Sequence, residues 1–463
     1  MMLTQTSTPG TDDWWVMQLA TDFGNDLPRL HKLQSYADGT NALPDEGDAG
    51  MKEAYRRFIH MSRLNMADLI VSTKVARMKP QGFRTAAPGD TDGDAAAYAM
   101  WKRSSMKVGV RDFLTDAGVL GAAYLTTTGP QNPSPQAEPL ILPSNGFTTV
   151  TRQYALRPWL AEASMQVGHD PVNGVDILTL FRDGTMRQAM RQAEKRSSIP
   201  SNGSRWQPGR GWQWVSDPLQ LGYTDTNPIF KLSGPGGMGM FEKHTDSLDR
   251  LTNRIRDGLT ISAMQAFRQR GIEGSLPQFY PEGHAKAGQK IDYNEMYKAG
   301  PAALWMLPLG AKVWESAVTD ITPILTATKD DAKHVAAVTS TPIYILSPDA
   351  ANASAEGAKA GGEAFMDSVE EWMERGEIPI VQSLSTGFAA MGDTVRSAVG
   401  EIEVIWAPVA RTSTQEKSSS ASQAKAGGLP QLLIDEKIWG LTPAEIAQAR
   451  QARSDEAFET ALS

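Results

Sequence analysis

A short run of small residues between two helical stretches constrains the fold of this chain most. Upstream of it, apolar residues recur every three or four positions and predict a helix from Asp320 to Leu346, with Pro323 in its first turn and Pro342 kinking or ending it. Downstream of Ser354, the same spacing predicts a second helix with an acidic outer face. The connection itself, TPIYILSPDAANASAEG at 341–357, carries no catalytic-looking side chain. We therefore expect it to act through its shape and through repetition in several copies.

The composition indicates a folded protein with more than one domain. A chain of 463 residues is too long for one compact core, so two to four domains or a non-globular architecture is expected. Hydrophobic residues at 41% and charged residues at 21% are typical of folded proteins. The lack of cysteine excludes disulfides, thiol catalysis and cysteine-bound zinc, and fits a reducing cytoplasm. No stretch approaches the roughly 20 apolar residues of a membrane-spanning helix, and the polar N-terminus lacks a secretion signal.

The first half of the chain predicts mixed helix and strand. Helical spacing predicts helices at 12–36, broken near Gly24 and Pro28, and at 51–79 and 94–117. The strands expected from residue type and alternation are 119–127, 148–155, 175–182, 185–191 and 212–215. Asp183-Gly184 joins two of these strands and is typical of a type I′ hairpin turn, because both central positions need a positive φ.

The tryptophans of this region allow two interpretations each. Trp14 and Trp15 lie at helical spacing, which favours a place in the core over a ligand-binding box. Trp206, Trp212 and Trp214 alternate with arginines, as in a platform for single-stranded nucleic acid. Half-buried strands of a sheet explain the same alternation and are the preferred interpretation.

A glycine-rich turn at Gly234–Gly239 satisfies the G-x-G-x-x-G pattern between a strand-like segment and a helix. Backbone amides at such a turn can hold a phosphate, so a nucleotide-binding enzyme is one hypothesis for this chain. The helix that follows runs from about Asp246 to Arg270, and no short return to a parallel strand follows it. A flexible hinge is the preferred interpretation of the turn.

Other catalytic patterns are weak. The six histidines are scattered without metal-ligand spacing, and no G-K-[ST] phosphate loop or G-x-S-x-G elbow occurs. The carboxylates Glu370, Glu371 and Glu374 lie where a solvated helix face would place them. We therefore expect no enzymatic activity, no metal and no cofactor.

Segment 341–357 closely resembles the tunnel-loop region of portal proteins from long-tailed bacteriophages, particularly those that infect actinobacteria. Other segments resemble further parts of the same family in the same order: 82–84 and 118–124 (wing), 248–273 (first stem helix), 305–313 (end of the clip), and 402–406 and 441–446 (C-terminal part). No single motif is specific. The colinear order over nearly the whole chain carries the resemblance.

The resemblance implies an α+β portal fold with an α/β wing, a two-helix stem, a small α/β clip, a tunnel loop and a helical crown. The implied parts are 1–240 (wing, N-terminal part), 241–274 (first stem helix), 275–316 (clip), 317–346 (second stem helix), 347–357 (tunnel loop), 358–410 (wing, C-terminal part with a long helix and a strand) and 411–463 (crown). On composition alone Arg411–Ala426 could be a linker, but its position in the family implies a helix of the crown instead. Thr442, followed by Pro443 and Glu445, predicts the capped start of a helix within the crown.

The family's function is implied in the same way. Portal proteins form dodecameric rings at a unique capsid vertex, through which double-stranded DNA is packaged and ejected, and they dock the terminase and the head–tail adaptor. The implied partners are identical copies, DNA in transit, the terminase large subunit, the adaptor, and the major capsid and scaffolding proteins, without a membrane. Assembly would occur in the host bacterial cytoplasm, and the chain would end in the virion. The formal net charge of −8 suits a channel that touches DNA only weakly, although an ordinary acidic protein has the same charge.

The resemblance also assigns candidate site residues. Those of the tunnel loop carry no positive charge, so they can approach a phosphate backbone without binding it tightly: Ser347, Pro348, Asp349, Ala350, Ala351, Asn352, Ala353 and Ser354. The expected wall of the stem contains Lys329, Lys333, Arg254 and Arg268, of which the two lysines are the expected weak phosphate contacts. Aromatic anchors suit the docking surface of the clip: Tyr293, Tyr297, Trp305 and Trp314.

Overall fold

The computed structural model describes residues 2–6, 8–42, 60–88, 93–129, 138–193, 203–266, 270–274, 276–293, 312–315, 317, 320–346, 355–410 and 412–462. The chain forms two compact units. Unit 1 comprises Met1–Asn41, Asn65–Thr245 and Ala336–Ser463, and unit 2 comprises Ala42–Leu64 and Asp246–Val335. Helices and strands occur in both units, as expected for an α+β protein.

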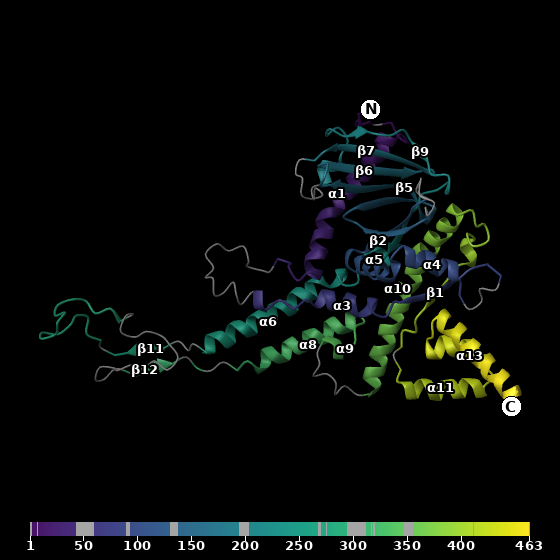
Figure 1. Cartoon of the computed structure of the whole chain (residues 1–463). Helices are drawn as coiled ribbons and strands as arrows, with labels where there is room; N and C mark the ends of the chain where they lie inside the picture. The colour runs from purple at the N-terminus through teal and green to yellow at the C-terminus, as the bar shows by residue number, and fades with distance from the viewer. Residues whose placement is uncertain are drawn as a thin grey trace. The chain divides into compact units, whose positions relative to one another are not determined.

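Unit 1 contains several antiparallel sheets, and the largest lies at the end that carries the N-terminus (Figure 1). The largest sheet has the order β4-β5-β6-β7-β8, with β9 also paired to β7, and its strands are Thr149–Tyr154, Arg157–Asp170, Val175–Arg182, Thr185–Gln192, Gln213–Trp214 and Leu219–Gln220. A three-stranded sheet has the order β10-β2-β3, with strands Ile229–Ser233, Ala122–Thr127 and Ile141–Asn145. In addition, β1 (Pro80–Arg84) pairs with β13 (Glu403–Trp406).

The hairpin between β6 and β7 confirms the prediction for its turn. Arg182 pairs with Thr185, and the two residues between them have positive φ, 47° at Asp183 and 65° at Gly184. By contrast, β5 was not predicted. This strand of 14 residues pairs with β4 along one edge and with β6 along the other. Its first residues, Arg157, Pro158 and Trp159, are exposed, so the sequence lacks a clear alternation there.

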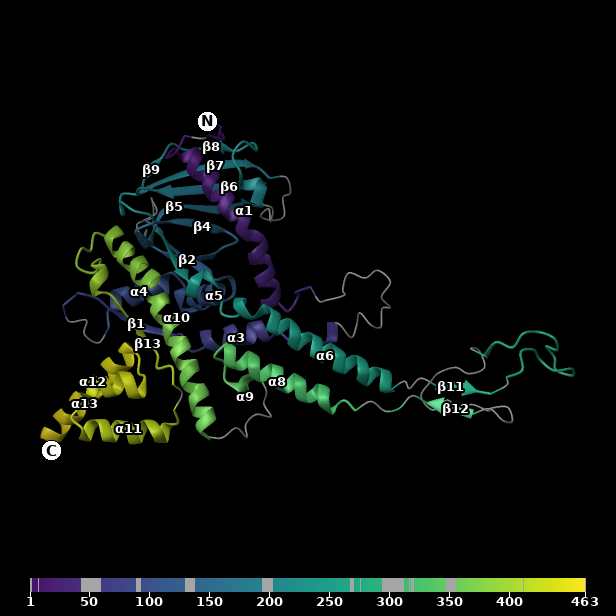
Figure 2. The same ribbon diagram turned by 180° about the vertical axis from the view of Figure 1, so that it is seen from behind.

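Helix α1 (Asp12–Ala37) is continuous, so the predicted break near Gly24 and Pro28 is wrong. Proline removes one hydrogen bond from a helix interior. Burial of Phe23, Leu27 and Leu30 on the same face offsets that loss, since tertiary packing contributes more to helix stability than local propensity. Figures 1 and 2 both show α1 lying along the six-stranded sheet.

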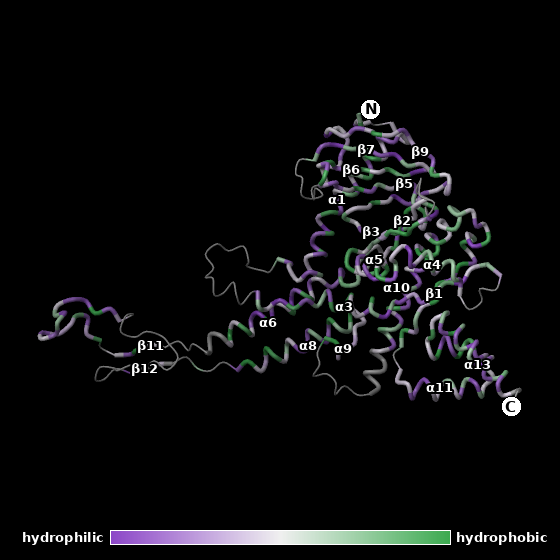
Figure 3. The backbone as a smooth tube through the Cα atoms, in the orientation of Figure 1, coloured by the Kyte–Doolittle hydropathy of each residue, from purple (hydrophilic) through white to green (hydrophobic). Residues whose placement is uncertain are grey.

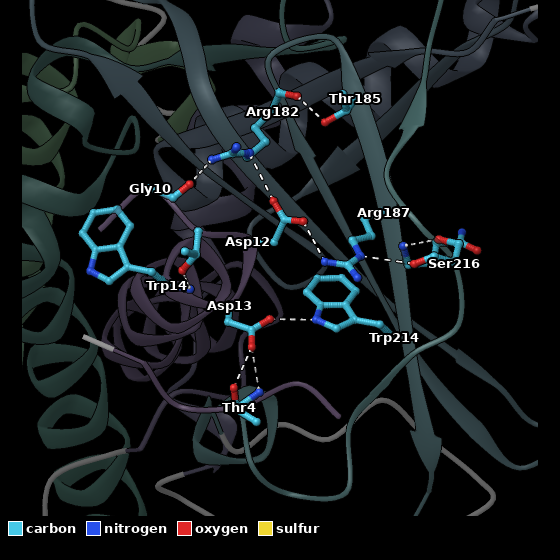
Figure 4. A network of polar contacts seen from close by, with 12 residues as sticks. Thr4, Gly10, Asp12, Asp13, Trp14, Arg182, Thr185, Arg187, Trp214 and Ser216 are labelled. Carbon is cyan, nitrogen blue, oxygen red and sulfur yellow. Dashed lines mark hydrogen bonds and ion pairs between the residues drawn. The ribbon is translucent and has the colours of Figure 1, made fainter. Parts of the chain in front are cut away.

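The main core of unit 1 lies between α1 and this sheet. Trp206 and Trp212 are fully buried in it and Trp214 is 5% exposed, which rules out a solvent-facing platform for nucleic acid. The first turn of α1 is held by the polar network in Figure 4. Asp12 accepts a hydrogen bond from Arg187 Nη1 at 2.8 Å, and Asp13 accepts one from Trp214 Nε1 at 2.7 Å.

The remaining helices of unit 1 follow the predicted positions with different ends. They are α3 (Met66–Val75), α4 (Ala95–Arg103), α5 (Met106–Leu120), α9 (Ile343–Leu346) and α10 (Ala355–Ala390), and short 3-10 helices lie at Gly203–Trp206, Pro235–Gly237, Glu242–His244 and Val399–Glu401. Ser105, with a φ of 55°, divides the single helix predicted at 94–117 into α4 and α5. Part of the helix predicted at 51–79 lies outside the described residues.

Helices dominate the C-terminal end of unit 1 (Figure 2). They are α11 (Thr414–Ala426), α12 (Gln431–Leu433), a π-helix (Ile434–Trp439) and α13 (Pro443–Leu462). Ser413 and Glu416 cap the start of α11 reciprocally, so a linker at this position is wrong. Thr442 and Glu445 form the predicted capping contacts of α13. Pro443 packs so closely that a Cβ on Gly82 would lie 2.6 Å from its Cγ.

The described residues of unit 2 include two long helices and a strand pair. Helix α6 spans Thr245–Ala266, β11 (Arg270–Glu273) pairs with β12 (Lys312–Glu315), and α8 spans Thr322–Val338. Pro323 lies in the first turn of α8 as predicted. The helix ends well before Leu346, however, and before Pro342. Ser340 adopts a φ of 48°, which a continuing right-handed helix cannot contain.

Candidate functional site

Helices α6 and α8 are joined by one acidic side chain. Asp331 of α8 lies 2.9 Å from Arg250 Nε and 3.5 Å from Arg254 Nε, both on α6. The helices also come close at Gly258, where a Cβ would lie 3.6 Å from Ile324 Cγ2. The side chain of Asp331 is 13% exposed, whereas that of Asp330 is 53% exposed. Two arginines spaced by one helical turn therefore share one largely buried carboxylate.

The apolar faces of these two helices are only partly covered. Leu251 and Val335 are buried, but Ile255, Leu259 and Ile261 are only half-buried. Leu325 of α8 is 52% exposed. Figure 3 shows hydrophobic and hydrophilic residues interspersed along both helices. The pair therefore retains apolar surface that a further packing partner could cover.

The predicted wall residues that the structure describes occupy different settings. Lys329 and Lys333 lie one turn apart on α8 and are exposed. Lys333 Nζ pairs with Asp330 Oδ1 at 2.8 Å on the same helix. Arg254 faces Asp331, so it helps to hold α6 against α8. Arg268 lies outside the described residues.

Most of the other predicted site residues also lie outside the described residues. This holds for the whole tunnel loop at 347–354 and for Tyr297 and Trp305 of the predicted clip. Trp314 lies on β12 and is 53% exposed, which suits an anchor for a partner. The hydroxyl of Tyr293 donates a hydrogen bond to the carbonyl of Pro277. That contact links two positions 16 residues apart in the predicted clip.

The glycine-rich turn at Gly234–Gly239 is built for backbone packing. A Cβ on Gly239 would lie 2.5 Å from the carbonyl oxygen of Val119, at the end of α5. The amide of Gly234 donates to the carbonyl of Gly121 at 2.9 Å, and the amide of Gly239 donates to the Glu242 carboxylate at 2.9 Å. These amides are therefore occupied, and a carboxylate lies where a bound phosphate would have to be. This geometry argues against a nucleotide site at the turn.

Sequence reasoning did not single out Asp331. It follows Asp330 directly, and two adjacent aspartates on a helix suggest a solvated face. A usable signal was present, because Asp331 continues the spacing of Ile324, Thr328 and Val335 on the inner face of α8. An acidic residue within an apolar stripe requires a cationic partner, and α6 supplies two.

The described residues contain no group of three or more His, Cys, Asp or Glu side chains placed to hold a metal ion. None of their helices is both long and apolar enough to span a membrane.

Comparisons with known proteins give likenesses to solved structures. No protein-family model matches the chain, and no curated protein matches it. The chain is similar to one of a solved structure described as the neck of a native GTA particle computed with C12 symmetry. The TM-score is 0.41 and the identity 11%, over 88% of this chain and 92% of that chain.

Proposed function

We propose that this chain is a portal protein that forms a dodecameric ring at a unique capsid vertex. The ring is a passive channel for packaging and ejecting double-stranded DNA. It also docks the terminase and the head–tail adaptor. The chain performs no catalysis and needs no cofactor in this role.

The partly covered helix pair of unit 2 is the observation that best supports this proposal. A helix pair that buries Leu251 and Val335 but leaves Leu325 half exposed has apolar surface to offer to another copy. In a ring, the same surface of every copy contacts the next copy, and the rotation closes. The order of elements fits as well, since helix, strand pair, second helix and long helix follow each other as the portal resemblance implies.

The charges of α6 and α8 suit a channel that does not hold DNA. Two of the arginines on α6 face Asp331, and Lys333 is paired with Asp330. Cations that already have carboxylate partners release fewer counterions from DNA, so their contacts with phosphates are weak. A duplex can then slide past them.

The assembly is tested by native mass measurement of the purified protein together with negative-stain imaging. Twelve chains of 50.2 kDa give a particle of about 600 kDa with a central pore. A monomer at every concentration would reject the proposal. Measurable nucleotide affinity would instead favour the enzyme hypothesis for the glycine-rich turn.

The channel role is tested in assembled rings with two changes. Replacing Ser347 to Ala353 by a bulky basic loop should leave the ring intact but slow DNA packaging or weaken retention. Replacing Lys329 and Lys333 by glutamate should alter DNA retention more than assembly. The matched control is Lys107→Glu on α5, an exposed lysine outside unit 2. If DNA translocation and retention equal those of wild type in both variants, the loop is not a constriction and the two lysines do not contact DNA.

A further inference from the structure

A small cavity in unit 1 collects cationic and hydroxyl side chains from four segments. Its volume is about 160 Å³. Its lining includes Lys74 of α3, Lys243 and His244 before α6, the turn at Val338–Ser340, and Ser368 of α10. These residues are far apart in the sequence, so no motif marks the cavity. The proposed function gives it no role.

Lys74 is the most unusual of these residues. Its side chain is 4% exposed, and its ammonium donates a hydrogen bond to Ser368 Oγ at 2.7 Å. An ammonium has three donors, so this contact leaves two for a further acceptor. The ion pairs found among the described residues do not include Lys74. A buried ammonium is costly without an anion, which makes this residue a ready anion ligand.

The cavity disfavours positive charge on Lys74 and His244, so a bound anion would stabilise the charged forms of these side chains. Burial lowers the pKa of Lys74 to about 8, which the carboxylate of Glu371 partly opposes. Burial also lowers the pKa of His244, and the charges of Lys243 and Lys74 lower it more. Glu371 lines the cavity too, but its Oε1 lies 2.9 Å from Arg375 Nη2. The negative charge of Glu371 is therefore largely compensated by Arg375, one turn further along α10.

The size of the cavity limits what can bind. Pockets for whole small-molecule ligands measure roughly 300–1,000 Å³, so a nucleotide does not fit into 160 Å³. A single tetrahedral oxyanion does, and it can accept several charge-assisted hydrogen bonds at once. We propose that Lys74, Lys243 and the hydroxyl of Ser368 bind one phosphate-type anion in this cavity. Free phosphate and the terminal phosphate of a nucleic-acid chain share this chemistry.

The position of the cavity gives such an anion a structural role. Ser340, on its rim, has a φ of 48° in the turn that follows α8. Lys243 lies two residues before Thr245, the first residue of α6. An anion bound by Lys74 and Lys243 would hold the residues just before α6 close to the turn that follows α8.

Binding is measured on the full chain by titrating inorganic phosphate at pH 7, with calorimetry and with the thermal unfolding midpoint as readouts. Wild type should bind with a millimolar or lower Kd, and its unfolding midpoint should rise with phosphate concentration. Lys74→Met should abolish binding, and Lys243→Gln and Ser368→Ala should each weaken it about tenfold. Lys107→Gln, an exposed lysine that does not line the cavity, is the matched control and should bind as wild type does.

The source of the anion is distinguished with two short oligonucleotides of the same sequence, one with a 5′-phosphate and one without. If only the phosphorylated strand displaces inorganic phosphate, the site binds terminal phosphates. If neither strand displaces it, the site binds free phosphate. Absence of phosphate binding at 10 mM in wild type would overturn the proposal. Equal binding by wild type, Lys243→Gln and Ser368→Ala would overturn it as well, even if Lys74→Met failed to fold.

Discussion

The two compact units of this chain differ in how completely they bury their apolar side chains. Unit 1 buries Trp206, Trp212, Trp214 and the inner face of α1 against its own sheet, so this core is formed within one chain. Unit 2 relies on a two-helix pair held by one aspartate, and Leu325 and Trp314 remain about half exposed. The contrast indicates that unit 1 folds on internal contacts. Under the proposed function, unit 2 gains its remaining burial from other copies of the chain.

The largest expected effect lies in unit 1. Trp212 is fully buried, so Trp212→Ala should leave a cavity and cost roughly 3–5 kcal/mol of unfolding free energy. Denaturant unfolding followed by tryptophan fluorescence measures this. Trp314→Ala in unit 2 is the control, with a cost below about 0.5 kcal/mol, because that side chain is 53% exposed. A similar loss of unfolding free energy in Trp212→Ala and Trp314→Ala would contradict the difference in burial between the two units.

A second change tests the buried charge within unit 1. Burial lowers the pKa of Lys74 to about 8, so at pH 7 folding must bury its positive charge. In phosphate-free buffer, Lys74→Met should therefore stabilise the protein by about 1–3 kcal/mol at pH 7. Between pH 8 and about 10.4, the unfolded chain keeps the proton that the folded chain has lost. Wild-type stability should rise in this window, and the advantage of the variant should shrink.

Thermal unfolding of both proteins at several pH values checks this sign. If the stability of Lys74→Met exceeds that of wild type by the same amount from pH 7 to pH 10, then Lys74 is not a desolvated ammonium.

A smaller effect is expected at the contact between α6 and α8. Asp331→Ala leaves Arg250 and Arg254 without their shared carboxylate, and should cost about 1 kcal/mol because both arginines are half exposed. The neighbouring Asp330→Ala is the matched control. It removes only an exposed pair with Lys333 and should cost less than about 0.5 kcal/mol. Hydrogen exchange of the α6 and α8 amides measures the difference, and equal protection in both variants would contradict the role of Asp331.

The smallest effect on the stability of one chain is expected at Leu325. Leu325→Gln removes a half-exposed apolar side chain and should change unfolding free energy by less than about 0.5 kcal/mol. It should nevertheless shift the assembly equilibrium toward smaller species, as sedimentation velocity would show. Leu251→Gln, at a buried position of α6, should instead destabilise the chain itself. Unchanged assembly by Leu325→Gln would mean that this surface is not an interface.

Local patterns predicted the elements of the chain better than their ends. The β6–β7 hairpin followed from Asp183-Gly184, since few other residue pairs adopt two positive φ angles. The continuity of α1 through Pro28 did not, because it depends on burial against a sheet that is distant in sequence. The end of α8 at Val338 depends on the backbone of Ser340, a residue that rarely marks a helix end.

The sites were less predictable than the fold. Lys329, Lys333 and Trp314 are exposed, and their roles at DNA or at a partner stay predictions. Asp331 and the cavity at Lys74 were missed because both combine residues from separate segments. Lys74 meets Ser368 across 294 positions, and Arg250 meets Asp331 across 81. Only the folded chain brings such pairs together.

Native mass measurement of the purified protein tests the central claim most directly, because that claim is assembly through unit 2. The account predicts a closed particle of about 600 kDa, twelve chains of 50.2 kDa, that loses mass when Leu325 is replaced by glutamine. A species of 50 kDa at every concentration, for wild type and variant alike, would contradict it.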